Sequence, residues 1–186
     1  MIINTIDILA IGIIVRGIIT GRSTLFISEL VKILGVVLAI CISIHYYDRL
    51  GRFLSEYMFV PESIADFLAY SGISFVIIFL FFLIKDGWSL IIHIQESPKF
   101  NYWGGLAVSM MKSYLLCGVM LIAFLLVSTP FFKSSAEKSL SLRLFRKLPA
   151  AIYKVFYGGI VVKLLPKEPS NADFINLMKS YNQGQV

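Results

Sequence analysis

The chain has 186 residues, of which 58% are hydrophobic, 14% aromatic and 15% charged. Soluble domains are about 45–50% apolar and about 25% charged, so this composition excludes an ordinary water-soluble domain. The net charge of +6 does not indicate nucleic-acid binding, because the excess lies mostly beyond residue 132, beside an apolar block where anionic lipid headgroups are the expected partners.

Four apolar stretches separated by polar turns are each close to the roughly 20 residues that a membrane-spanning helix needs. The first span is predicted at about 2–19 and the second at about 28–47. The second ends in His45, Tyr46 and Tyr47, whose amphipathic rings suit the headgroup level of a bilayer.

The third span is predicted at 64–84, after a polar linker at 48–63, and the fourth at about 104–128. Between them, the apolar stretch Trp88–Ile94 is either an interfacial segment or part of a span. The predicted fold is an all-α integral membrane protein with four transmembrane helices, which together form a transmembrane domain of residues 1–132.

A basic amphipathic helical segment is predicted at 133–165, because apolar residues recur there at helical spacing among lysines and arginines. Pro149 interrupts the pattern, so one helix and two shorter helices are both open. Residues 166–186 are polar and are predicted to form a flexible tail. The residues expected to bind anionic lipid are Arg143, Arg146, Lys147 and Lys154.

Five charged residues fall inside the predicted spans, where a charge is costly and a partner is expected. They are Asp7, Arg16, Glu29, Lys32 and Lys112. In an alternating topology Glu29 and Lys112 approach from the same membrane face, so an interhelical ion pair is one hypothesis. The other is that Glu29 pairs with Lys32 on its own helix while Lys112 reaches alone to the interface.

Small residues at four-residue spacing mark surfaces where membrane helices approach closely. Two such stripes occur: Gly35, Ala39 and Ser43 in the second span, and Gly105, Ser109, Ser113 and Cys117 in the fourth. The stripe in the fourth span is interpreted either as the wall of an aqueous or solute pathway or as a helix–helix seam with its hydroxyls bonded to backbone. Both interpretations can hold together.

The sequence does not predict an enzyme, a metal site or a cofactor. The histidines His45 and His93 lack metal-ligand spacing, and no phosphate-binding glycine loop, nucleophile elbow or paired-cysteine motif occurs. Cys41 and Cys117 lie in apolar runs, where a thiol packs as a small residue, so no disulfide is expected.

The order of these features resembles the bacterial colicin V production protein (CvpA) family over most of the chain, through the fourth span. The positions that carry the resemblance are Ile6-Asp7, Glu29, His45-Tyr46-Tyr47, and the series Gly105, Ser109, Lys112 and Ser113. The chain departs from the family pattern at two pairs: Thr24-Leu25 stands where the family usually has Arg-Gly, and Asn101-Tyr102 where it has Asp-Arg.

The resemblance implies a multi-pass protein of the bacterial inner membrane, tied to toxin production or export and to envelope homeostasis. The helical layout of the family has been suggested to be similar to that of small-conductance mechanosensitive channels. This similarity adds the expectation that an oligomer of the chain forms a channel-like conduit. The alternative is a membrane scaffold whose basic tail binds lipid without moving any solute. The expected partners are the bilayer, anionic lipids, and either further copies of the chain or envelope proteins, and not nucleic acid.

The basic residues of the loops give two answers for the orientation of the chain in the membrane. The short loops of one face hold Arg16, Arg22, Lys85 and Lys99, against Arg49 and Arg52 on the other. Counting the basic residues of the tail reverses this balance. The first helix and the charge pattern of the family favour both termini on the periplasmic side.

Overall fold

A computed structural model describes residues 5–91, 98–127, 145, 147–164, 170–171 and 174–176 of the chain. All regular elements in these residues are helical, as predicted. The elements are four long helices, α1 (Thr5–Ser23), α2 (Phe26–Met58), α3 (Glu62–Ile91) and α4 (Pro98–Leu126), and then the short helix α7 (Lys147–Phe156), a π-helical turn η1 (Tyr157–Val161) and α8 (Val162–Leu164).

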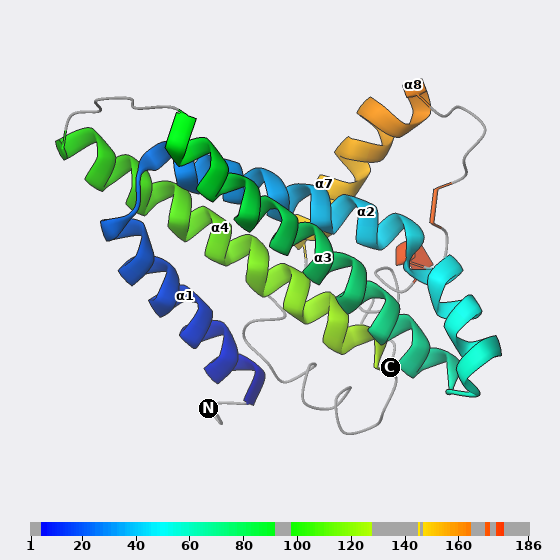
Figure 1. Cartoon of the computed structure of the whole chain (residues 1–186). Coiled ribbons are helices and arrows are strands. Elements are labelled where there is room, and N and C mark those ends of the chain that lie inside the picture. The colour runs from blue at the N-terminus through cyan, green and yellow to red at the C-terminus, as the bar shows by residue number, and fades with distance from the viewer. Residues whose placement is uncertain are drawn as a thin grey trace.

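The long helices form two pairs (Figure 1). Helix α1 packs mainly against α4, helix α3 packs mainly against α2, and the pairs meet where α2 contacts α4. Helix α7 lies against α2 and also contacts α4. The core along this central contact consists of fully buried apolar side chains, among them Ile40, Ile44, Leu115, Leu121 and Ile122.

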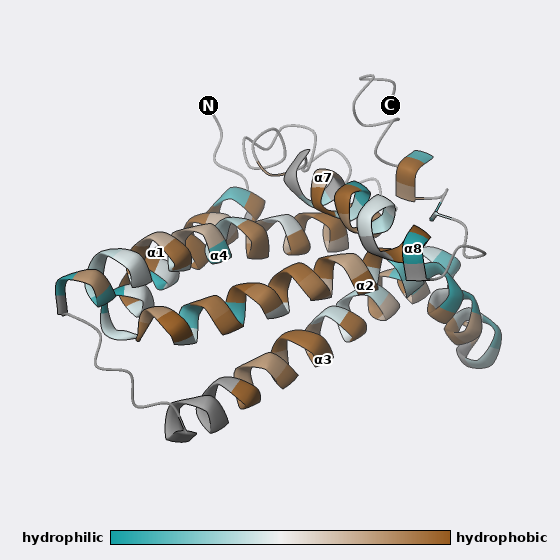
Figure 2. Ribbon diagram, turned by 90° about the horizontal axis from the view of Figure 1, so that it is seen from above, coloured by the Kyte–Doolittle hydropathy of each residue, from teal (hydrophilic) through white to brown (hydrophobic). Residues whose placement is uncertain are grey.

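Three helical stretches are long and apolar enough to cross a membrane: Phe26–Tyr57, Glu62–Ile84 and Lys99–Leu126. Figure 2 shows the hydrophobic residues that run along α2, α3 and α4. Helix α1 is not among these stretches, because its 19 residues include the charges of Asp7, Arg16 and Arg22. Three of the four predicted spans are therefore supported by length and composition, and a crossing by α1 is a proposal.

Large apolar side chains on α1 and α3 point away from the bundle. Ile19 on α1 is 67% exposed and Phe75 on α3 is 68% exposed. Contiguous exposed apolar surface is unusual on a protein surrounded by water. In a bilayer the same surface faces lipid, which agrees with the apolar composition of these helices.

The helices are longer than the sequence predicts, and the expected linker at 48–63 is mostly helical. Helix α2 continues to Met58, and its extension carries an Asp48–Arg52 ion pair of 3.1 Å one turn apart. The chain turns only at Phe59, which takes a left-handed conformation with φ 52°. Pro61 follows two residues later, and a proline cannot continue a helix.

Part of the stretch Trp88–Ile94 is helical, which both the interfacial and the spanning alternatives allow. Helix α3 extends to Ile91, beyond the apolar stretch that ends at Ile84, so residues 88–91 form its last turn. Residues 92–94 lie outside the described part of the chain. Helix α4 likewise begins at Pro98, six residues before the predicted start of the fourth span.

The basic segment at 133–165 contains short helices in its described part. Pro149 lies in the first turn of α7, where a residue without an N–H group is tolerated, and its ring packs on Gly118 of α4. The π-helical turn η1 then separates α7 from α8. Residues 133–144, which include Arg143, lie outside the described residues, as do Arg146 and the side chain of Lys147. Lys154 is exposed.

Candidate functional site

Glu29, in the first turn of α2, is a fully buried carboxylate with three donors around it. The hydroxyl of Thr24 donates to Oε1 at 2.9 Å, the ammonium of Lys32 pairs with Oε1, and the ammonium of Lys112 pairs with Oε2. Both pairings considered from the sequence are therefore present at once. A buried ion pair is tolerated only when further hydrogen bonds satisfy its polar atoms, and this carboxylate has them.

The start of α2 holds this cluster in place. Asn101 of α4 accepts a hydrogen bond of 2.7 Å from the backbone N–H of Phe26, one of the N–H groups that a helix start leaves without an internal partner. The ring of Phe26 packs edge-on against Phe100, with 5.1 Å between the centroids. The positive end of the α2 dipole also favours a carboxylate in its first turn.

The small-residue stripe of α4 lies against α1. The hydroxyl of Ser109 donates to the carbonyl of Gly17 at 2.7 Å, and a Cβ added to Gly105 would lie 2.9 Å from the carbonyl oxygen of Gly21. The other two members of the stripe donate to carbonyls as well, Ser113 to Ser109 and Cys117 to Ala10. The bond of Ser113 lies within α4, whereas the bonds of Ser109 and Cys117 and the close approach at Gly105 form a helix–helix seam with α1.

The small-residue stripe of α2 lies against α3. A Cβ added to Gly35 would lie 2.5 Å from the Cβ of Phe81, and Ala39 is fully buried. The hydroxyl of Ser74 donates to that of Ser43 at 2.8 Å. Each stripe therefore serves a different helix pair.

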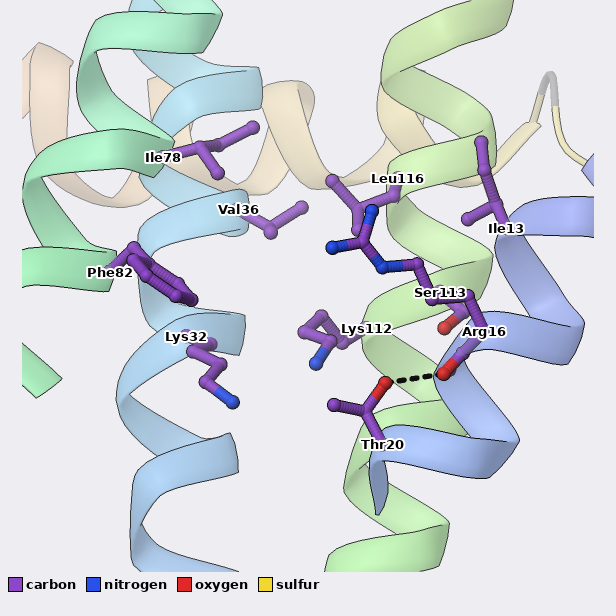
Figure 3. Close-up of a pocket in the computed structure, with 11 residues that line it drawn as sticks. Ile13, Arg16, Thr20, Lys32, Val36, Ile78, Phe82, Lys112, Ser113 and Leu116 are labelled. Carbon is purple, nitrogen blue, oxygen red and sulfur yellow. Dashed lines mark hydrogen bonds between the residues drawn. The ribbon is translucent and has the colours of Figure 1, made fainter. Parts of the chain in front are cut away.

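A cavity of about 280 Å³ lies between the two helix pairs (Figure 3). Its cationic lining residues are Arg16, Lys32 and Lys112, one from each of α1, α2 and α4. The rest of the lining is polar or apolar and consists of Ile13, Gly17, Thr20, Val36, Ile78, Phe82, Ser113 and Leu116. Four of the residues singled out from the sequence therefore line one cavity, namely Arg16, Lys32, Lys112 and Ser113. Asp7, near the start of α1, does not line it.

A second polar cluster, which the sequence did not reveal, joins the C-terminal segment to α2. The hydroxyl of Tyr153 on α7 lies 3.2 Å from Nδ1 of His45 and accepts the backbone N–H of Asn171 at 3.1 Å. The side-chain amide of Asn171 donates to the carbonyl of Ile44 at 2.8 Å. Burial raises the pKa of the Tyr153 hydroxyl, which stays a neutral donor and acceptor at ordinary pH.

This second cluster changes the interpretation of two regions. His45, predicted from the sequence to lie at the membrane interface, is buried, and its Nδ1 lies within hydrogen-bond distance of Tyr153 on α7. Within 166–186, predicted as a flexible tail, Asn171 and Phe174 are buried, and the rest of that range lies mostly outside the described residues. In the described part of the chain, no group of three or more histidine, cysteine, aspartate or glutamate residues is arranged to hold a metal ion.

Residues 6–149 match a family model described as the colicin V production protein. The match covers more than half of the chain and runs from α1 into α7. The chain belongs to the colicin V production protein family. Comparison with curated proteins and with solved structures found no match for this family member.

The two departures from the pattern that the resemblance implies both lie at the buried cluster around Glu29. Thr24, at a position where the resemblance leads one to expect arginine, donates directly to Glu29. Asn101, at a position where it leads one to expect aspartate, still supplies the acceptor for the start of α2. Both side chains are uncharged, so Lys32 and Lys112 provide the charges that pair with the carboxylate.

Proposed function

We propose that the chain is a multi-pass protein of the bacterial inner membrane that acts as an oligomeric conduit in toxin production or export, or in envelope homeostasis. The family match supports the link to toxin production, and three helices of membrane-spanning length support the location. The conduit rests on one observation, the cavity lined by Arg16, Lys32 and Lys112. Ionisable groups at membrane depth are costly, and in membrane proteins they mark substrate and ion pathways.

The conduit requires more than one copy of the chain. The cavity of about 280 Å³ is slightly smaller than the roughly 300–1,000 Å³ of small-molecule sites, and the apolar core between α2 and α4 adjoins it. A continuous path would therefore form between copies. The outer face of α3 offers a surface for such contact, since Phe75 and Phe79 are exposed and stacked with 5.9 Å between their centroids.

Flux through proteoliposomes tests the conduit. The purified full-length chain is reconstituted, crosslinked to determine its oligomeric state, and assayed for release of trapped ions and small solutes. Wild-type vesicles should release solute faster than protein-free vesicles, Lys112→Met should change the rate, and Lys99→Met, which removes an exposed charge from the same helix, should not. A monomer with no release above the protein-free rate would contradict the proposal.

A scaffold that binds lipid through its basic segment is the second candidate, and α7 favours it. Its residue Tyr153 is buried against the bundle, whereas Lys154 and Val155 are exposed, with Val155 at 76%. Helices with both cationic and apolar exposed residues lie in membrane interfaces. A peptide of residues 138–165 should bind anionic vesicles more tightly than neutral ones and lose that preference in salt, and equal binding to both would refute this candidate.

A further inference from the structure

We propose that the cavity between α1, α2, α3 and α4 is an anion site that takes a phosphate group, with the Arg16 guanidinium as its main ligand. This inference goes beyond the proposed conduit and does not depend on it, because a bound phosphate group can anchor lipid or a small anion whether or not a solute crosses the membrane. Its basis is the charge around the cavity and the direction of Arg16.

The cavity has an excess of positive charge. Three cations line it, and no acidic side chain is among its lining residues. Glu29 pairs with Lys32 and Lys112 from behind the wall, so a single negative charge faces three positive ones. Like charges that line one cavity repel each other, and an additional anion would relieve this repulsion.

Arg16 is the cation that Glu29 does not neutralise. Within the described ranges no carboxylate forms an ion pair with its guanidinium, and only its backbone carbonyl accepts a hydrogen bond, from Thr20. Figure 3 shows the guanidinium directed toward Val36 and Leu116, away from Thr20 and the C-terminal end of α1. Arg16 is an exposed residue, and its guanidinium is directed toward other lining residues of the cavity.

The chemistry of the lining favours phosphate. A guanidinium presents a planar pair of N–H donors that matches phosphate oxygens, and the ammonium groups of Lys32 and Lys112 add point charge nearby. Ile13 on α1 and Ile78 and Phe82 on α3 supply apolar walls beside the cations. Such a site suits either the headgroup phosphate of a lipid, whose chains would contact these walls, or a free phosphate ion.

Binding to the full-length protein in phosphate-free neutral detergent tests the proposal. In the first experiment, inorganic phosphate is titrated and the thermal stability of the protein is followed. In the second, short-chain phosphatidylglycerol is added and the retained lipid is counted by native mass spectrometry. The control for the second is a phosphate-free diacylglycerol of the same chain length. Wild type should bind at least one phosphate probe saturably and should not retain the diacylglycerol. Binding of inorganic phosphate identifies a free-ion site, and binding of phosphatidylglycerol alone identifies a headgroup site.

Variants of α1 decide whether Arg16 is the ligand. Arg16→Gln should weaken binding by roughly tenfold to a hundredfold, the loss expected for hydrogen bonds to a charged group, and Arg16→Lys should retain part of it. Arg22→Gln is the matched control, because it removes one exposed charge of the same helix outside the cavity and should leave affinity unchanged. The proposal is overturned if wild type binds neither probe saturably, if Arg22→Gln weakens binding as much as Arg16→Gln does, or if Arg16→Gln leaves binding intact.

Discussion

Removing the charge of Glu29 should destabilise the protein more than removing the charge of Lys112. In Glu29→Gln, the ammonium groups of Lys32 and Lys112 remain close together without their anion, and breaking a buried ion pair in this way costs about 3–5 kcal/mol. Both lysine side chains are 12% exposed and can shift toward water, so a value near the lower end is expected. In Lys112→Met, the carboxylate keeps Lys32 and Thr24, and the expected loss is about 1–3 kcal/mol.

The double variant measures the contact itself. Once Glu29 is neutral, Lys112 no longer has an ion pair to lose. The double variant, Glu29→Gln with Lys112→Met, should therefore lose less free energy of unfolding than the two single variants lose in sum. The expected coupling is about 0.5–2 kcal/mol, in the range found for contacting residues. The double variant should still be less stable than wild type, because Lys32 remains without its anion.

Unfolding in mixed micelles, followed by circular dichroism as the fraction of denaturing detergent rises, gives the required free energies. Lys99→Met serves as the control, since it removes an exposed lysine of α4 that does not contact Glu29, and it should change stability by less than about 0.5 kcal/mol. Strict additivity of Glu29→Gln and Lys112→Met would refute the coupling and leave Lys32 as the effective partner of the carboxylate.

Three further changes test other parts of the fold. Gly17→Ala places a Cβ 1.8 Å from the Ser113 hydroxyl and should lower the free energy of unfolding by about 1–3 kcal/mol in the same assay. The control Gly12→Ala places its Cβ in open space and should be neutral or slightly stabilising. Equal effects of the two variants would contradict the α1–α4 seam. Tyr153→Phe removes the hydroxyl that joins α2 to Asn171 and should speed proteolysis of the C-terminal segment, and an unchanged cleavage rate would mean that this cluster does not hold the segment. Reporter fusions after residue 60 and at the C-terminus should report the same compartment, because α3 and α4, which lie between them, are both long and apolar enough to cross a membrane. Opposite compartments would require an odd number of crossings.

The sequence predicted the helical class from the length of its apolar blocks, and it predicted the proximity of Glu29 and Lys112 from the alternating direction of successive helices. Apolar blocks of about 20 residues determine helices, and alternating crossings determine which charges share a membrane face. Alternation does not fix the rotation of each helix, so it could not decide between Lys32 and Lys112 as the partner of Glu29. It also could not show that Arg16 lines the same cavity.

The contacts that the sequence missed lack a repeating pattern. Asn171 is a single polar residue in a polar segment, and nothing in its neighbours indicates that it is buried against Ile44 and Tyr153. The sequence did not predict that α2 continues past Tyr47, because charged residues indicate the end of a membrane span but not the end of a helix. One signal was available and not used: Gly17 and Gly21 repeat at four residues in α1 and face the stripe of α4.

The account of the chain as a four-helix membrane bundle requires that α1 crosses the membrane together with α2, α3 and α4. Labelling of single-cysteine variants by a membrane-impermeant thiol reagent tests this most directly, with Cys41 and Cys117 replaced and new cysteines placed at the N-terminus, in the turn at Thr24 and in the turn at Val60. If α1 crosses, the N-terminus and residue 60 are labelled from one side of the membrane and residue 24 from the other. Labelling of the N-terminus and residue 24 from the same side would contradict a four-helix membrane bundle.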